Sequence, residues 1–324
     1  MDLTTRYLGL ELRNPLVASA GPLARTVAGV ERLADAGVGA VVLSSLFEEQ
    51  FEPGGPTTPG GQRRDPGGYL ELMERCAENV QVPVIPSLNG CTTGGWTSYA
   101  SAMQGAGAPA IELNLYFPQA DPLISGSEIE RRHIEVLTTV KAAVDIPVAV
   151  KITPFLSSPG EFALRLDEIG ADGLVLFNRF MQTGIDPETL DVDAGFELSR
   201  SADATFARAW IARLRGRVDA SLAASTGVDE AGDVAAYLLA GADVVMTTSA
   251  LLRHGPEHAE KLLYGLTGWL RRKGFDGLDE VRGLLAEPLA KRAADIRGYG
   301  GGREGYLDAL EHATAKYGAD VEGI

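Results

Sequence analysis

A single lysine interrupts the apolar stretch at residues 147–154, whose sequence is PVAVKITP. Lysine is almost never buried without a partner, so we expect the ammonium group of Lys151 to lie at a cavity or at the rim of the fold. There it could extend to solvent, form a Schiff base with a carbonyl substrate, or place a positive charge beside an electron-rich cofactor. The apolar surroundings favour the two chemical roles over the first.

Small polar residues and glycines end the other apolar runs of the chain. They are Ser19, Ala20 and Gly21, then Ser44 and Ser45, Asn89, Asn114, Asn178, Ser225, Thr226 and Gly227, and finally Thr248 and Ser249. Together with Lys151 they predict a hydrogen-bonding cup that carries one positive charge. The set has no cluster of His, Asp or Glu, so we expect no metal site. Each asparagine by itself could equally be a structural amide.

Two of these strand ends carry a pattern that suits phosphate. Thr226-Gly227 and Thr248-Ser249 each stand between an apolar run and an amphipathic stretch. Loop N–H groups and helix N-termini bind phosphate in this position, and small residues let the anion approach the backbone. Ordinary helix capping by Thr and Ser uses the same residues. The pattern therefore indicates a phosphorylated ligand, with capping as a compatible second role.

An internal repeat predicts the elements that position these residues. Four segments, AGVGAVVLSS, GAGAPAIELN, EIGADGLVLFN and LAGADVVMTTS, combine a helix end, a glycine and an apolar strand. Four further apolar runs, NPLVASAG, VQVPVIPSLNG, DIPVAVKITP and RVDASLAASTG, bring the strand candidates to eight. Amphipathic stretches separate them, and we expect the glycines to end these helices in the left-handed conformation.

Apolar strands that alternate with helices predict a parallel sheet covered by helices on its outer face. Eight such units, without a GxGxxG motif after the first strand, favour a (β/α)8 barrel over residues 1–272. A Gly/Pro-rich insertion at residues 48–69 follows the second strand and is either a lid or surface decoration. Residues 273–324 are charged, and we expect a helical C-terminal extension. Barrel enzymes build their sites at the carboxyl ends of the strands, where the polar residues stand.

Composition narrows the class of protein and its partners. The chain has 324 residues and a formal net charge of −15, which argues against nucleic acid or an anionic membrane surface as a partner. Its start lacks a signal-peptide pattern, and no apolar run is long enough to span a bilayer, so we expect a cytoplasmic protein. Two cysteines without a CxxC pair exclude an iron–sulfur motif within the chain. A one-electron partner would have to be a separate subunit.

The motifs NPLVASAG, IELN, PVAVKITP, STGV and GADVVMTTSALLRHGP together resemble the FMN-binding barrel of class 1 dihydroorotate dehydrogenases, over roughly residues 3–270. The resemblance implies a TIM barrel, an FMN cofactor, oxidoreduction in pyrimidine metabolism and a homodimer. The residues it implies for the cofactor are Ser19, Ala20, Gly21, Ser45, Asn89, Asn114, Lys151, Asn178, Thr226, Gly227, Thr248 and Ser249. In particular, Lys151 would face the flavin N1 and O2 edge and stabilise the anionic reduced ring. Gly227, Thr248 and Ser249 would hold the phosphate.

The substrate half of the resemblance departs from the family pattern. In the family, the asparagine that ends this strand is followed three residues later by a cysteine or serine that removes a substrate proton. Here that residue is Phe117, which cannot accept a proton. Tyr116, Asp121 and His133 are the candidates for a replacement, and Tyr116 joins Lys151 and Asn114 as an expected catalytic residue. Ser44 also stands where the family usually has a lysine.

These residues are compatible with three functions. The first is an FMN-dependent oxidoreductase that acts on CH–CH bonds, with dihydroorotate or another small dihydropyrimidine-like molecule as substrate. The second is a flavin-free barrel enzyme for a sugar phosphate, with Lys151 as its Schiff-base nucleophile. The third is a flavoprotein that only transfers electrons with a separate redox partner. We expect the first, because only flavin chemistry accounts for the amides at the strand ends.

Overall fold

The computed structural model describes residues 1–50, 66–90, 96–115, 122–179, 182–195 and 197–287. The candidates Tyr116, Phe117 and Asp121 lie outside these ranges. The same holds for residues 51–65 of the Gly/Pro-rich insertion and for residues 288–324 of the C-terminal extension.

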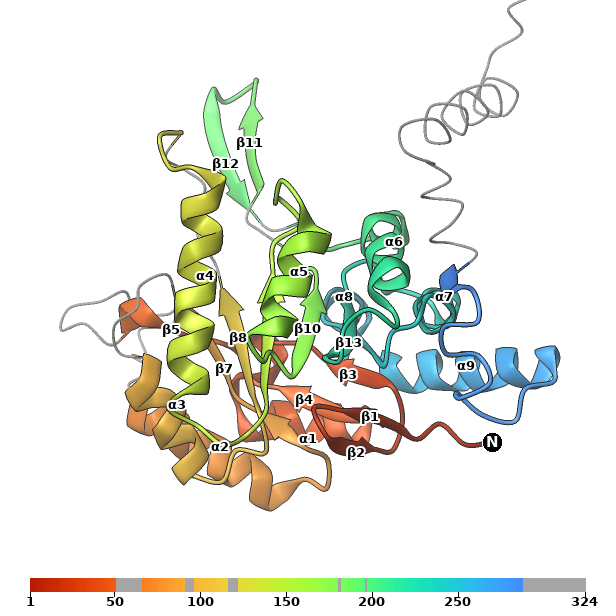
Figure 1. Ribbon diagram of the computed structural model, residues 1–324. Helices are drawn as coiled ribbons and strands as arrows, with labels where there is room; N and C mark the ends of the chain where they lie inside the picture. Colours follow the sequence, from red (N-terminus) through yellow and green to blue (C-terminus); the bar gives the residue numbers. More distant parts are fainter. Residues whose placement is uncertain (51–65, 91–95, 116–121, 180–181, 196, 288–324) are drawn as a thin grey trace, which may run out of the picture.

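Ten strand segments form one parallel sheet at the centre of the molecule (Figure 1). They are β3 (Leu16–Ala18), β4 (Ala40–Val42), β5 (Leu46–Phe47), β6 (Val84–Ile85), β7 (Ser87–Gly90), β8 (Ile111–Leu115), β9 (Val148–Ile152), β10 (Gly173–Leu176), β13 (Ser221–Ser225) and β14 (Val244–Thr247). Their order in the sheet is β5-β7-β8-β9-β10-β13-β14-β3-β4-β6.

This order closes on itself. β4 pairs with β6 and β5 pairs with β7, while β4 and β5 are successive pieces of one strand. Pro86, which has no N–H to donate, separates β6 from β7 in the same way. The two ends of the ten-segment order are therefore halves of neighbouring strands, and the sheet is a closed barrel of eight strands. The predicted TIM barrel is confirmed.

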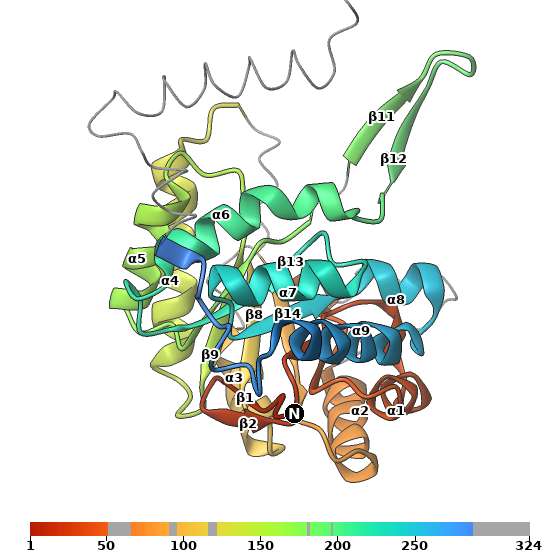
Figure 2. The same cartoon turned by 90° about the vertical axis from the view of Figure 1, so that its right-hand side faces the viewer.

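Helices surround the barrel, as Figures 1 and 2 show. They are α1 (Val27–Asp35), α2 (Pro66–Asn79), α3 (Trp96–Gly105), α4 (Gly126–Lys141), α5 (Pro159–Glu168), α6 (Ala204–Leu214), α7 (Ala231–Ala240), α8 (Ser249–His254) and α9 (His258–Lys273). As predicted, glycines with positive φ follow α1, α3, α5 and α7, namely Gly37, Gly107, Gly170 and Gly241. None of the helices in the described ranges is long and apolar enough to cross a membrane.

The side chains inside the barrel form a core of their own, separate from the layer between strands and helices. An N-terminal hairpin, β1 (Thr5–Tyr7) and β2 (Leu10–Leu12), adds Tyr7, Leu8 and Leu12 to this inner core. Hydrogen bonds tie the hairpin to Asp243 and Ser221, at the amino ends of β14 and β13. The hairpin therefore covers the amino-terminal end of the barrel, and the site is left at the other end.

Two parts of the fold differ from what the sequence predicts. The composition predicts one irregular insertion over residues 48–69, but Glu48–Gln50 is a short 3-10 helix and α2 already begins at Pro66. Tyr69 is buried, and its hydroxyl accepts from the Ser87 N–H at 2.9 Å. Hydrophobic burial of this tyrosine extends the helix into the Gly/Pro-rich stretch.

The second difference follows α9. The helix expected directly after Lys273 is interrupted, because Gly274 adopts φ +79 and its N–H caps the end of α9. Residues 274–285 form turns and bends, and Leu278 and Val281 are buried in the outer core. The N–H groups of Gly283 and Leu285 donate to carbonyls of α7. This part of the extension is packed on the barrel.

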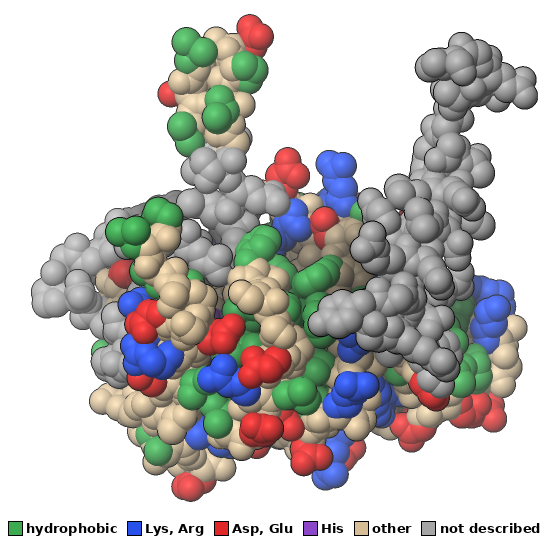
Figure 3. Space-filling model, turned by 45° about the horizontal axis from the view of Figure 1, so that its top comes forward, with side chains coloured by type: hydrophobic (Ala, Val, Ile, Leu, Met, Phe, Trp, Pro, Cys, Tyr) green, Lys and Arg blue, Asp and Glu red, His purple; other side chains and the backbone are tan. Residues whose placement is uncertain are grey.

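A second hairpin, β11 (Gln182–Asp186) and β12 (Asp191–Gly195), extends away from the barrel between β10 and α6 (Figures 1 and 2). The sequence did not predict it. Ile185 and Leu190 are 80% and 85% exposed, and the space-filling view shows apolar side chains on the hairpin (Figure 3). Elsewhere on this face, acidic and basic side chains are interspersed.

Candidate functional site

One cavity of about 580 Å³ lies at the carboxyl ends of the barrel strands. That volume is within the range of sites for small molecules and cofactors. With the exception of Gly227, every expected cofactor residue lines it: Ser19, Ala20, Gly21, Ser45, Asn89, Asn114, Lys151, Asn178, Thr226, Thr248 and Ser249. The structure therefore brings together residues that are spread over most of the barrel sequence.

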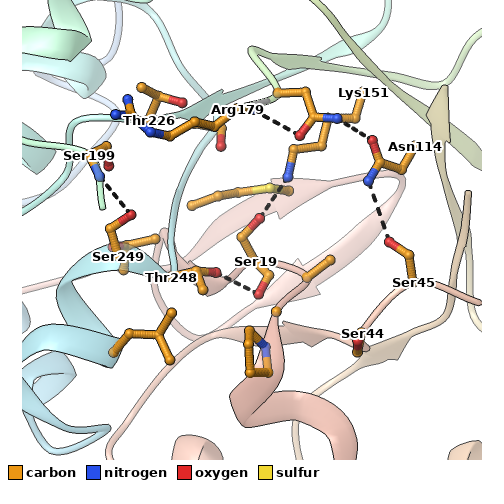
Figure 4. Close-up of a pocket in the computed structure, with 18 of the residues that line it drawn as sticks. Ser19, Ser44, Ser45, Asn114, Lys151, Arg179, Ser199, Thr226, Thr248 and Ser249 are labelled. Atoms are coloured by element: carbon orange, nitrogen blue, oxygen red, sulfur yellow. Dashed lines mark hydrogen bonds between the residues drawn. The ribbon is translucent and has the colours of Figure 1, made fainter. Parts of the chain in front are cut away.

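Lys151 crosses the floor of this cavity. It lies on β9, and its Nζ donates to the Ser19 Oγ at 2.9 Å, as Figure 4 shows. β9 and β3 stand half-way round the ring from each other, so the lysine side chain spans the mouth of the barrel. Its side chain is only 5% exposed. The alternative in which Lys151 extends to bulk solvent is therefore wrong.

A chain of amides and hydroxyls covers one side of the cavity. Asn178 donates to the Asn114 Oδ1. Asn114 Nδ2 donates in turn to the Ser45 Oγ at 3.4 Å (Figure 4). Ser45 in turn shares a hydrogen bond of 2.9 Å with Ser87. The strand register also puts Asn89 beside Asn114, and Asn114 beside Lys151. These groups can donate to and accept from a planar heteroaromatic ligand.

The loops after β13 and β14 meet on the opposite side. Thr248 Oγ1 donates to the Ser19 carbonyl at 2.8 Å, and Thr226 Oγ1 donates to the Phe177 carbonyl at 3.2 Å. Ser199 joins the two loops, since its Oγ accepts from the Gly227 N–H and its N–H donates to the Ser249 Oγ, both at 3.1 Å. The hydroxyl and N–H groups expected to face a phosphate are thus gathered in one place.

Gly227 differs from its expected role as a lining residue. Its φ is +69, and a Cβ at this position would lie 2.4 Å from the Ala204 backbone nitrogen. The glycine is required by a left-handed turn packed against the start of α6. Its N–H, which the Ser199 Oγ holds, is the group that could contact a ligand.

Sequence reasoning missed two arginines and the segment at residues 197–199. Arg25 and Arg179 both line the cavity, as does Glu197. Arg179 is held by the Glu197 carbonyl at 2.7 Å and by the Asp203 carboxylate at 3.1 Å. Arg179 directly follows Asn178, so a search that included one more residue after each strand end would have identified it. With Lys151, the lining cations outnumber the acid, which suits an anionic ligand on a protein of charge −15.

His133, one of the alternatives for the proton-transfer residue, lies outside the site. It is on α4, fully buried, with its ring edge-on to Phe162 at 5.4 Å. Burial lowers its pKa to about 4, despite a hydrogen bond from its Nδ1 to the Ile129 carbonyl. It does not line the cavity. In the described ranges no three His, Cys, Asp or Glu side chains group as metal ligands would.

A closed parallel barrel with a polar cavity at the carboxyl ends of its strands is the architecture of (β/α)8 barrel enzymes. The family model described as dihydroorotate dehydrogenase matches residues 68–270, and the chain belongs to that family. It is a dihydroorotate-dehydrogenase-like oxidoreductase.

Similar proteins agree with this assignment. The chain is 30% identical over 298 residues to the dihydroorotate dehydrogenase B (NAD(+)) catalytic subunit of Methanothermobacter thermautotrophicus, covering 87% of this chain and 98% of the relative. It is 31% identical over 300 residues to the subunit of the same name from Methanocella arvoryzae, covering 88% and 98%. It is 26% identical over 317 residues to the NAD-dependent dihydropyrimidine dehydrogenase subunit PreA of Escherichia coli K12, covering 87% and 76%.

Proposed function

We propose that the protein is an FMN-dependent oxidoreductase that acts on a CH–CH bond of a small dihydropyrimidine-like substrate. The observation that carries the proposal is the buried Lys151 ammonium at the cavity floor, held by Ser19 on one side and adjacent in register to Asn114. Bound FMN supplies the capacity to accept a hydride from the substrate. The residues of the chain have to bind and orient that cofactor and provide a positive charge beside it.

The residues present fit FMN in type and in position. Lys151 offers a positive charge for the ring, and Asn114 and Asn178 offer amides at its polar edge. At the other side of the cavity, Thr226, Thr248 and Ser249 would hold the phosphate. There the Gly227 N–H donates to the Ser199 Oγ, and a phosphate oxygen would replace this acceptor or share the N–H with it. The cavity volume and the cationic lining support this fit.

The substrate is expected to carry a carbonyl or carboxylate group next to the bond that is oxidised. Arg25 Nε lies 3.5 Å from the Ser44 Oγ, so a guanidinium stands beside the position where the resembling enzymes usually have a lysine. A guanidinium is suited to carboxylate recognition. The names of the relatives, dihydroorotate dehydrogenase and dihydropyrimidine dehydrogenase, support this class of substrate. We retain Lys151, Asn114 and Tyr116 as the proposed catalytic residues.

An anaerobic absorption spectrum of the purified protein tests the proposal, recorded before and after addition of dihydroorotate and, separately, dihydrouracil. Oxidised-flavin bands that bleach with either compound support it and identify the substrate. Bands that persist with both compounds support the cofactor and contradict the substrate class. A colourless protein that takes up no added FMN contradicts the proposal, and borohydride trapping of a sugar phosphate on Lys151 would then favour the Schiff-base enzyme.

A second candidate is a flavoprotein that exchanges electrons with a separate subunit and oxidises no small molecule itself. Phe117 at the position of the family's proton-accepting residue favours it, and the names of the relatives describe them as subunits. Flavin that an added reductase subunit reduces, and that dihydropyrimidines do not, would establish this role. We expect the chain itself to form a homodimer, which sedimentation equilibrium measures directly.

A further inference from the structure

Glu112 is a buried carboxyl group that the proposed chemistry does not use. It lies on β8, two residues before Asn114, so both side chains point into the barrel. The register sets Glu112 beside Ser87 on β7 and Ala149 on β9, one layer below the Asn114–Lys151 pair. Its side chain is 1% exposed. The carboxyl group is therefore directly beneath the floor of the cavity.

No hydrogen-bond donor in the described part of the chain reaches this carboxyl group. Both Oε1 and Oε2 are buried without a partner. Ser87, its neighbour on one side, shares its hydroxyl with Ser45 instead. Ala149, its neighbour on the other side, has no polar side-chain atom. A carboxylate in this position would be an ion buried without hydrogen bonds, which is strongly unfavourable.

Among the described residues, the ionisable groups that interact with Glu112 are Lys151 and Tyr7, and Asp243 interacts in turn with Tyr7. Lys151 is one layer above, but its ammonium is bonded to Ser19, and within those residues no ion pair within 4.0 Å joins it to Glu112. Tyr7, from the N-terminal hairpin, is buried below, and burial raises the pKa of its phenol. Asp243 lies near the barrel's amino end and is paired with Arg215 at 2.9 Å. Burial likewise raises the pKa of Glu112, an effect that the Lys151 charge partly offsets.

We propose that Glu112 is a neutral carboxylic acid in the folded protein at neutral pH, and that its neutrality leaves the Lys151 ammonium as an uncompensated positive charge on the cavity floor. Glu112 is thus a positioning residue that acts through Lys151. An ionised carboxylate one layer below would cancel most of that charge for any anion bound above. Insofar as the anion is reduced flavin, this inference rests on the proposed function.

The protonation state of Glu112 is measured on the protein without FMN. Infrared difference spectra of wild type minus E112Q are recorded at pH 7, with E260Q as the control, because Glu260 is an exposed glutamate on α9. We expect the E112Q difference to contain the carbonyl stretch of a protonated acid, shifted after refolding in D2O. The E260Q difference should contain only carboxylate bands. Carboxylate bands for Glu112 would overturn the inference.

A second measurement concerns the charge that the cavity presents. The ratio of affinities for reduced and oxidised FMN is determined for wild type, E112Q and E260Q from dissociation constants and the midpoint potential. If Glu112 is neutral, E112Q changes this ratio by less than about threefold, since no charge is removed. A change of about tenfold or more in favour of reduced flavin shows an ionised Glu112 and contradicts the inference.

Two further outcomes are distinguishable. If E112Q does not fold, wild-type protein labelled with 13C-glutamate is compared with unlabelled wild type instead. A glutamate that is protonated at pH 7 then shows a carbonyl stretch that the isotope shifts. The absence of that band would overturn the inference. If the protein binds no FMN, the proposed function fails, but the infrared spectrum still decides the protonation state of Glu112.

Discussion

The ammonium group of Lys151 and the hydroxyl group of Ser19 lie 2.9 Å apart, although 132 residues separate them in the chain. They come from strands on opposite sides of the barrel, so their hydrogen bond exists only because the sheet closes. The bond fixes a long, flexible side chain across the floor of the cavity. A positive charge held there before ligand binding needs little reorganisation to stabilise an anion.

Replacing Lys151 with Met should weaken FMN binding by about 10–100-fold, because a charge-assisted contact of about 1.5–3 kcal/mol is lost. The fold should survive, since an apolar side chain in place of a buried charge is often tolerated. Fluorescence titration of the flavin-free protein measures the affinity. Lys261 is an exposed lysine on α9, and its change to Met is the control that should bind FMN normally. Equal affinity in both variants would contradict the assigned role.

Ser199→Ala removes the hydroxyl that accepts from the Gly227 N–H. The N–H loses its acceptor, so we expect the free energy of unfolding to fall by about 1–3 kcal/mol in the absence of flavin. Excess FMN should reduce this difference, because a phosphate oxygen would replace the lost acceptor. Urea unfolding with and without FMN measures both effects. Ser98→Ala, at an exposed position on α3, is the control, with an expected change within about 0.5 kcal/mol.

Gly227→Ala should destabilise the protein by several kcal/mol, on the order of 3 or more. The added Cβ would lie 2.4 Å from a backbone atom of Ala204, at a φ of +69. At Gly232, on α7, an added methyl group would meet no atom within 4 Å, and the backbone has no positive φ. Its change to Ala should alter stability by less than about 1 kcal/mol. Thermal unfolding of both variants distinguishes a steric requirement from a general effect of alanine.

Glu112 should make stability fall as the pH rises. Its pKa in the folded protein is raised from 4.5, so the folded state keeps a proton that the unfolded chain releases. The site's contribution is present below pH 4.5 and is lost as the pH rises through the folded pKa. Wild type should therefore lose stability relative to E112Q by about 1.4 kcal/mol per pH unit above 4.5, until the pH passes the folded pKa. Parallel curves for the two proteins, from urea unfolding at several pH values, would contradict this.

His133 should make stability fall as the pH falls, which is opposite to the effect of Glu112. Its pKa is lowered from 6.5 to about 4 on folding, so between these pH values the unfolded chain binds a proton and the buried imidazole stays neutral. The stability from this site is present above pH 6.5 and is lost as the pH falls towards 4. Between these values His133→Leu should lose less stability than wild type, by on the order of 3 kcal/mol. Acid unfolding monitored by circular dichroism measures the difference.

Much of the site was predictable because local sequence determines where parallel strands end. The signals that mark a strand end are adjacent in the sequence: a glycine, then an apolar run, then a polar residue. Asn114, Lys151 and Thr248 could therefore be predicted without knowledge of distant contacts. Glu112 was not among the predicted residues, although the alternation of side chains along a strand puts it on the same face as Asn114. Local patterns of this kind also sufficed to predict a barrel rather than an open sheet.

Contacts between distant segments could not be read in this way. Ser199 stands in no repeat, and its role arises only because its segment lies against two strand ends that are far away in the sequence. The pairing of Lys151 with Ser19, and the isolation of Glu112, depend on which groups the closed barrel brings within about 3 Å of one another. The sequence by itself determined which strand-end residues line the barrel mouth, with the exception of Gly227. Tertiary structure added Arg25, Arg179 and residues 197–199, and it decided which side chains are bonded or buried, because those contacts join segments that are distant in the chain.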